Sequence, residues 1–202
     1  GFQGIRQYVG PVYGDGNSYN LPTQDLYDAF SSFDGRRGVT ILDIEAFIAE
    51  QDNPDLISYA IGAGGHTGYY NNKYIKRQGE IGLPDNDLTS PVNYRVIRYA
   101  DVLLMAAEAH FQAGSGGAAQ GYFNEIRVRA GVQPFPISSI EDIYNERRLE
   151  LACEGHRFFD LVRTGQAEQH IDGFVVGKHE LFPIPQLEID LAGGNWSQNP
   201  GY

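Results

Sequence analysis

The feature that most restricts the fold is a long run of strong helix formers at residues 98–113, RYADVLLMAAEAHFQA. On a helical wheel the polar residues form one narrow stripe, made of Arg98, Asp101, Glu108 and Gln112. A helix that is apolar around most of its circumference is expected to be buried on several sides. Gly114 is placed to end this helix as a left-handed cap. The run therefore predicts an interior helix and a mainly α-helical fold.

A second helix is predicted at about 117–130. Apolar residues recur there at three- and four-residue spacing before Gly131, at Ala119, Phe123, Ile126 and Ala130. The short Gly/Ser connection makes the two helices an antiparallel hairpin, about the size of one tetratricopeptide unit. Because one hairpin cannot bury both of its faces, further helices must pack on it. A third helix is predicted from a capping box at 138–141 to about 154, and a short fourth one at 156–165.

The third predicted helix carries like charges at four-residue spacing, at Glu146, Glu150 and Glu154. Such charges repel one another unless cations lie between them, and Arg147, Arg148, Arg157 and Arg163 are near in sequence. One interpretation is an acid–base pair or a metal cage. The other is a set of structural ion pairs, made of Arg147, Glu150, Glu154 and Arg157, that fixes the third and fourth helices to the hairpin. We favour the structural interpretation, because the arginines outnumber what a catalytic pair needs.

The first half of the chain differs in kind. Residues 1–22 are rich in glycine, proline and tyrosine and predict turns and loops. A helix is predicted at 24–33 with Thr23 as its N-cap, 39–61 is open between strand and helix, and 61–74 reads as a loop. We therefore divide one domain, 1–202, into a loop-rich part at 1–95 and a helical scaffold at 96–202.

The net charge of −11 and the pI near 4.8 disfavour nucleic acid and anionic lipid surfaces as partners, because both are polyanions. They do not restrict a neutral ligand. No stretch approaches eighteen apolar residues, so no membrane-spanning helix is predicted. The single cysteine, Cys153, is interpreted as a small core residue inside the third helix.

Cofactor motifs are weak. The histidines lie too far apart for a metal-binding helix motif, and the glycine-rich segment 62–65 lacks the lysine of a phosphate loop. Asp-Gly-Asn at 15–17 and Asp-Asn-Asp at 85–87 could offer oxygens to calcium, but neither continues as an EF-hand, and ordinary turns are favoured. We therefore expect that the protein needs no cofactor, and calcium is the one metal whose binding should be tested.

Four stretches of the second half carry a resemblance to a known family: 96–109 (VIRYADVLLMAAEA), 123–132 (FNEIRVRAGV), 143–165 (IYNERRLELACEGHRFFDLVRTG) and 181–191 with 198–202 (LFPIPQLEIDL, QNPGY). Together they resemble the SusD/RagB family. The resemblance implies an all-helical protein with tetratricopeptide-like units and long irregular loops. It also implies a lipid-anchored protein on the outer face of the outer membrane that hands oligosaccharides, or in some members peptides, to a TonB-dependent SusC-like transporter. Family members are not enzymes and need no cofactor, although some bind calcium.

Ligand-binding residues are predicted from residue type and place, because the family has no portable sugar-site motif. A sugar platform needs aromatic rings on loops, with amides and carboxylates nearby. The residues that meet this description are Tyr8, Tyr13, Tyr19, Tyr69, Tyr70 and Asn71. The resulting hypothesis is non-catalytic capture of oligosaccharides. The alternatives are a helical scaffold for protein–protein contacts and a glycan-active enzyme that uses Glu150 or Glu154.

Overall fold

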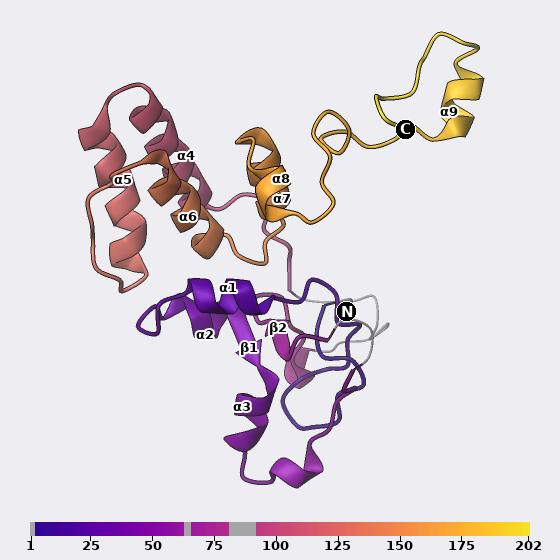
Figure 1. Cartoon of the computed structure of the whole chain (residues 1–202). Helices are drawn as coiled ribbons and strands as arrows, with labels where there is room; N and C mark the ends of the chain where they lie inside the picture. Colours follow the sequence, from indigo (N-terminus) through magenta and orange to yellow (C-terminus); the bar gives the residue numbers. More distant parts are fainter. Residues whose placement is uncertain (1–2, 63–65, 81–91) are drawn as a thin grey trace. The chain divides into compact units, whose positions relative to one another are not determined.

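The computed structural model describes residues 3–62, 66–80 and 92–202. It is mainly helical, as predicted, with one short two-stranded sheet in the described ranges (Figure 1). The chain divides into two compact units, 1–155 and 156–202. This division falls sixty residues after the change of character predicted at 95/96, and the single-domain interpretation stays a prediction. None of the helices in the described ranges is both long enough and apolar enough to cross a bilayer.

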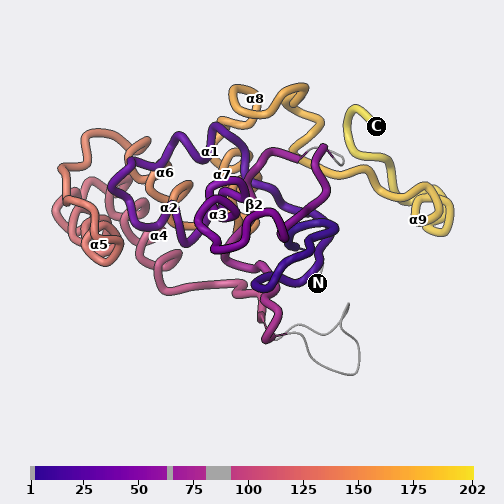
Figure 2. The backbone as a smooth tube through the Cα atoms, turned by 90° about the horizontal axis from the view of Figure 1, so that it is seen from below, coloured from indigo at the N-terminus to yellow at the C-terminus, as the bar shows by residue number. Residues whose placement is uncertain are grey.

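The predicted helical hairpin is present in the first unit. Helix α4 (Tyr99–Gln112) and helix α5 (Gly116–Arg129) lie side by side, and α6 (Ile140–Glu150) packs on α4 (Figures 1 and 2). Gly114 and Gly131 end the first two helices with positive φ angles of 76° and 73°, as expected for left-handed caps. The buried side chains between the helices include Leu104, Ala107, Ala119, Phe123, Ile126 and Ile143.

Helix α4 is buried on fewer sides than its sequence predicts. Leu103 and Leu104 pack with Ile126 of α5, but Val102 and Met105 on the other side are 43% and 46% exposed. The reason is that α5 and α6, which pack on it, cover only one side of the helix.

Helix α6 begins as predicted and ends early. The carboxylate of Asp142, rather than that of Glu141, accepts hydrogen bonds from the backbone amides of Ser138 and Ser139, at 2.7 and 3.0 Å. The helix ends at Glu150, so the prediction that Cys153 lies inside it is wrong. Cys153 has a φ of +64° in the turn that follows, and burial raises the pKa of its thiol to about 11. A thiol with that pKa is protonated and unreactive at neutral pH.

The first eighty residues form short elements around an irregular core. They are α1 (Gln24–Ala29), α2 (Arg36–Thr40), β1 (Ile41–Asp43), α3 (Ile44–Ala49), the 3₁₀ turns Pro54–Leu56 and Gln78–Glu80, and β2 (Tyr69–Asn71). Thr23 caps α1 as predicted, through a hydrogen bond from the Leu26 amide to its hydroxyl, but α1 ends four residues before the predicted end. Strands β1 and β2 pair antiparallel, with Ile41 opposite Asn71. The sequence analysis left the region of β1 open between strand and helix and predicted a loop for the region of β2.

Residues 3–22 have almost no regular structure and still help to build this core. Isolated β-bridges join Val9 to Ser58 and Tyr13 to Arg77, so backbone hydrogen bonds connect this segment to residues distant in sequence. Gly16 passes so close to Gly4 that a Cβ at position 16 would lie 2.6 Å from the Gly4 carbonyl carbon. Only glycine permits this approach.

The second unit contains α7 (Arg157–Arg163), α8 (Ala167–His170) and α9 (Gln186–Leu191). Gly165 ends the predicted fourth helix with a φ of 69°, and α9 begins directly after Pro185, where a helical turn was predicted. Leu161, Ala167 and Phe174 form a small core. Gln198 holds the C-terminal segment in place. Its side-chain oxygen accepts from the Ile184 backbone amide at 2.7 Å, and its side-chain nitrogen donates to the Ile184 carbonyl oxygen at 2.8 Å.

Candidate ligand-binding surface

Four of the six predicted ligand-binding residues lie in the interior. Tyr8, Tyr13, Tyr70 and Asn71 are each at most 6% exposed. The three rings pack with the isoleucines of the first-half core, and the Asn71 amide donates to the Cys153 carbonyl oxygen at 3.1 Å. The prediction that these four side chains stand exposed on loops is therefore wrong. The prediction assumed that a segment rich in glycine and proline is exposed. Residues 3–22 are instead bridged to residues 58 and 77, and Tyr8 and Tyr13 are buried in this packing.

Among the predicted ligand-binding tyrosines, Tyr19 is the one that is strongly exposed, with 60% of its surface accessible to solvent. Its neighbours Ser18 and Asn20 have φ angles of 55° and 56°, a strained conformation for residues other than glycine. The side-chain amide of Asn20 donates to the Cys153 carbonyl at 3.0 Å, which anchors the turn to the end of α6. The ring is thus exposed by a fixed, strained backbone, an arrangement that recurs at ligand-binding sites.

Tyr69 is half-buried and points to the opposite side of β2 from Tyr70. Its ring stacks on Tyr27 with centroids 4.6 Å apart, and its hydroxyl donates to the side-chain amide oxygen of Gln24 at 3.0 Å. The guanidinium of Arg37 lies 4.8 Å from the centre of the Tyr27 ring. Tyr69 therefore supports a second ring, Tyr27, that the sequence analysis missed.

Tyr27 opens onto a cavity of about 430 Å³ between α1, α2 and α3, called here the Tyr27 cavity. Its lining combines aromatic and polar side chains, namely Tyr27, Phe47, Ser32, Arg37, Asp43 and Glu50. Asp43 is occupied as the N-cap of α3, whereas Glu50 and Ser32 are exposed. Aromatic faces beside hydroxyl-binding groups are what a sugar ring requires. No spacing pattern could have found the cavity, because its residues come from α1, α2, β1, α3 and the turns beside them.

Two carboxylates of α6 and that of Glu154, in the turn after it, meet a group of cations, as the structural interpretation predicted. Glu146, Glu150 and Glu154 have side chains that are 2% exposed. Their partners are Arg36, Lys73, Arg98, Arg127 and Arg129, from outside α6. These ion pairs join α6 to α2, to the segment after β2 and to both helices of the hairpin. The oxygens of these buried carboxylates are already committed to ion pairs with several cations, so the arrangement gives no support to an acid–base pair.

Arg147 forms a buried ion pair that fixes α6 to the hairpin, as predicted, and its partner is Asp101 of α4 at 2.8 Å. The sequence analysis missed the cations that hold the three glutamates, because they come from distant segments of the chain. Arg148 instead pairs with Asp25 of α1, and Arg163 pairs with Asp160 at 2.8 Å. Arg157 is half-buried at the start of α7, and its part in the network stays a prediction.

Glu154 shows how the network controls ionisation. Burial alone would raise the pKa of this carboxyl, but hydrogen bonds from Arg98 at 2.7 and 2.9 Å and from Lys73 at 2.6 Å outweigh burial and lower it. For Lys73 the balance is opposite, and burial lowers the pKa of the ammonium in spite of Glu154. Glu154 is therefore charged in the folded protein even below the pH at which an exposed glutamate takes up a proton.

A loss of stability in acid follows from this shift. A carboxyl with a lowered folded-state pKa stabilises the fold above its unfolded pKa of about 4.3, and the contribution disappears as the pH falls through the folded value. We expect the free energy of unfolding of the first unit to fall steeply below about pH 4.3, measured by denaturant titration with far-UV circular dichroism. The Glu154→Gln variant should show a shallower fall. A wild-type stability that stays constant or rises in this range would contradict the assignment.

The first proposed calcium turn, residues 15–17, carries no metal-ligand cluster among the described residues. The Asp15 carboxylate accepts hydrogen bonds from the Gly16 amide at 3.0 Å and from the Tyr8 amide at 3.4 Å, which makes it part of an ordinary turn. No group of three or more metal-ligating side chains occurs among the described residues. The second turn, 85–87, lies outside them.

These features define a mainly helical protein in which an irregular, tyrosine-bearing segment is fixed to a helical hairpin by buried ion pairs. The family model described as the SusD family matches residues 58–202, and the chain belongs to that family. The sequence is 29% identical to SusD-like protein P2 of Formosa agariphila, over 98% of this chain and 43% of the relative. The chain thus spans less than half the length of this relative.

Solved structures agree with this assignment. A laminarin-binding SusD-like protein is 40% identical with a TM-score of 0.82, over all of this chain and 43% of the other. Surface glycan-binding protein A from Bacteroides thetaiotaomicron, in complex with laminarihexaose, is 30% identical with a TM-score of 0.85, over 98% of this chain and 45% of the other.

Proposed function

We propose that the protein captures oligosaccharides at the cell surface without cleaving them and passes them to a TonB-dependent, SusC-like transporter. The observation that carries the proposal is the 40% identity, over the whole chain, to a protein described as laminarin-binding. The first ligand to test is therefore laminarin, a neutral glucose polymer. A neutral ligand agrees with a net charge of −11, since it is not repelled by an acidic surface.

Within this chain the Tyr19 turn and the Tyr27 cavity are the proposed ligand contacts. An exposed, fixed ring can stack on a sugar face without a large loss of side-chain freedom. The exposed Glu50 carboxylate at the Tyr27 cavity can accept hydrogen bonds from sugar hydroxyls. Glu150 and Glu154, which the enzyme alternative would use, are instead held by cations.

We expect Tyr19→Ala to weaken laminarin binding by about tenfold or more, since losing one stacking contact of about 1.4 kcal/mol has that effect. Isothermal titration calorimetry on the full-length protein and on this chain measures the change. Tyr99→Ala is the matched control, because Tyr99 is also strongly exposed, at 69%, but lies on α4. Equal affinity of the Tyr19 variant and wild type would overturn the assignment of this ring.

Two further measurements test the rest of the proposal. Incubation with laminarin should release no shorter products, and product formation that disappears in Glu150→Gln would favour the enzyme alternative.

The full-length protein should co-purify with a transporter of the SusC type from membranes. Absence of any glycan binding together with stable capture of other proteins would favour the helical-scaffold alternative.

A further inference from the structure

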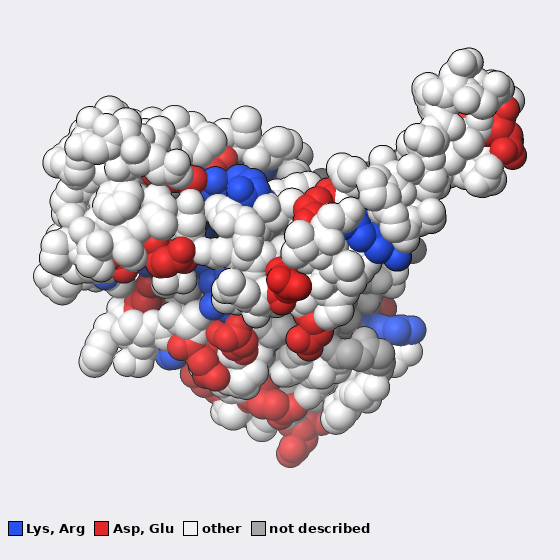
Figure 3. Space-filling model, turned by 45° about the horizontal axis from the view of Figure 1, so that its top comes forward, with Lys and Arg blue, Asp and Glu red and all other residues white. Residues whose placement is uncertain are grey.

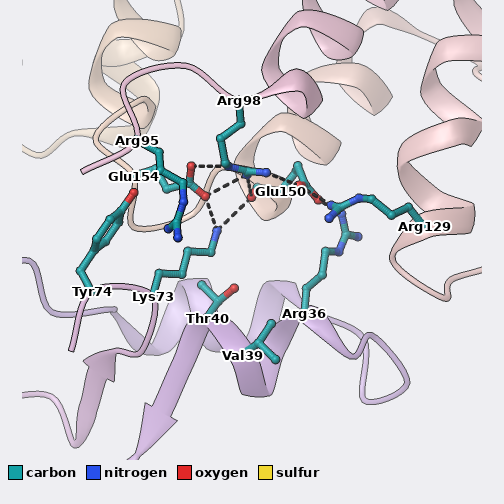
Figure 4. Close-up of a pocket in the computed structure, with 10 residues that line it drawn as sticks. All are labelled: Arg36, Val39, Thr40, Lys73, Tyr74, Arg95, Arg98, Arg129, Glu150 and Glu154. Atoms are coloured by element: carbon teal, nitrogen blue, oxygen red, sulfur yellow. Dashed lines mark hydrogen bonds and ion pairs between the residues drawn. The ribbon is translucent and has the colours of Figure 1, made fainter. Parts of the chain in front are cut away.

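A second cavity, of about 190 Å³, lies where the ion pairs of α6 reach the surface (Figure 4). It is several times larger than the roughly 30 Å³ that one water occupies in the liquid, so it can hold a small polar group. Its lining is strongly basic, with five cations against two carboxylates: Arg36, Lys73, Arg95, Arg98 and Arg129 against Glu150 and Glu154. We call it the arginine cavity.

Such a lining is unusual for this chain, whose formal net charge is −11. On the face shown in Figure 3, acidic side chains are spread widely and basic side chains gather in a few small patches. An excess of positive charge in a partly enclosed cavity attracts anions more strongly than the same charge on a flat surface, because low-dielectric walls concentrate the field.

Three of the five cations direct most of their hydrogen-bond donors into the ion-pair network. Arg98 gives four hydrogen bonds to Glu150 and Glu154, and Arg36 places its donors on Asp34, Glu146 and Glu150. The Lys73 ammonium bonds the Glu154 carboxylate and the Glu150 carbonyl oxygen. These contacts already compensate both carboxylates of the cavity, so the remaining two cations are in excess.

Those two cations have donors to spare. Arg129 reaches Glu150 through one terminal nitrogen, while its side chain remains 57% exposed. Arg95 is exposed and forms no ion pair within the described part of the chain. In Figure 4 its guanidinium extends from the loop before α4 into the cavity, on the side of Lys73. A guanidinium group with free donors that extends into a positively charged cavity matches the requirements of an oxyanion, which guanidinium binds in bidentate fashion.

We propose that the arginine cavity binds an oxyanion, the carboxylate or sulfate group of an acidic sugar, with Arg95 as its direct ligand. Lys73 and the buried ion pairs keep the cavity positive and hold its walls in place. The proposal concerns a site separate from the Tyr27 cavity and does not depend on laminarin binding, since laminarin carries no charge.

The test compares acidic and neutral sugars. Calorimetry or nuclear magnetic resonance titration of the chain with glucuronate, glucose 6-sulfate, inorganic sulfate and glucose should show binding of the anions and none of glucose. Affinity should decrease as salt is raised, because the attraction is between charges. The stronger of the glucuronate and glucose 6-sulfate responses identifies the preferred group. Binding of glucose as tight as that of glucuronate, or no response to any anion, would overturn the proposal.

Variants then locate the site. Arg95→Ala should weaken anion binding at least tenfold, and Arg95→Lys should keep part of the affinity because it retains charge but loses the bidentate geometry. Arg6→Ala is the matched control: it removes one exposed arginine of the same unit outside the cavity and should leave binding unchanged. Arg95 is exposed and unpaired in the described ranges, so unfolding of its variants is not expected, and circular dichroism checks this. Equal affinity of Arg95→Ala and Arg6→Ala would overturn the assignment.

Discussion

Replacing Arg36 with methionine is expected to lower the free energy of unfolding of the first unit by about 3–5 kcal/mol. The buried guanidinium bonds Asp34 at 2.7 Å, Glu146 at 2.6 Å and Glu150 at 3.2 Å. Methionine fills similar space but leaves these buried carboxylates without one of their cations. Removing one partner of a buried ion pair is far more destabilising than replacing the pair as a whole, because an uncompensated charge remains in the interior.

Arg37 is the matched control for this experiment. It follows Arg36 in the same short helix, α2, but its guanidinium lies over the Tyr27 ring and is only half-buried. Arg37→Met should cost about 0.5–1 kcal/mol, the usual strength of an exposed cation–π contact. Similar losses in the two variants would contradict the role given to Arg36.

These losses are best measured by urea unfolding followed with far-UV circular dichroism, since the helices of the first unit dominate that signal. Fluorescence of Trp196 would mislead, because the only tryptophan lies in the second unit. A chain with two units need not unfold in one step, and the transition of each must be followed separately.

The second large effect is expected for Phe123→Ala. The Phe123 ring is fully buried between Ala107 and Ile143, and it meets Phe135 edge-on with centroids 5.2 Å apart. Truncation leaves a cavity at the junction of α4, α5 and α6, and such changes usually cost about 3–5 kcal/mol.

Val128→Ala provides the comparison on the same helix. Val128 is 63% exposed, and its truncation should change stability by no more than about 0.5 kcal/mol. A loss below about 1 kcal/mol for Phe123→Ala would mean that the hairpin is not packed as described.

Local sequence patterns predicted the second half of the chain well. The spacing of Ala119, Phe123 and Ile126 defined the buried face of α5, and Gly114, Gly131 and Gly165 ended three helices where expected. These features depend on residues within one or two turns of each other, so the sequence contains the necessary information. The end of α6 was predicted too late in the sequence, because Leu151 and Ala152 are good helix formers. The chain instead turns there, with Cys153 and Gly155 at positive φ.

The candidate site was harder to predict, for a physical reason. Tyr19 and Tyr8 look alike in a glycine-rich segment, and only the bridges to residues 58 and 77 decide that the segment buries Tyr8. Arg36 and Arg37 are identical neighbours, and only the approach of α6, more than a hundred residues later, makes one a buried ion-pair partner and the other a lining of the Tyr27 cavity.

The sequence by itself determined the helical hairpin, its stops and the need to neutralise Glu146, Glu150 and Glu154, because all three follow from periodicity and from charges at four-residue spacing. Only the tertiary structure decided which cations do so, which tyrosines face solvent and where the two cavities lie. Burial and long-range pairing depend on contacts between segments far apart in the chain, and local preferences leave such contacts undetermined.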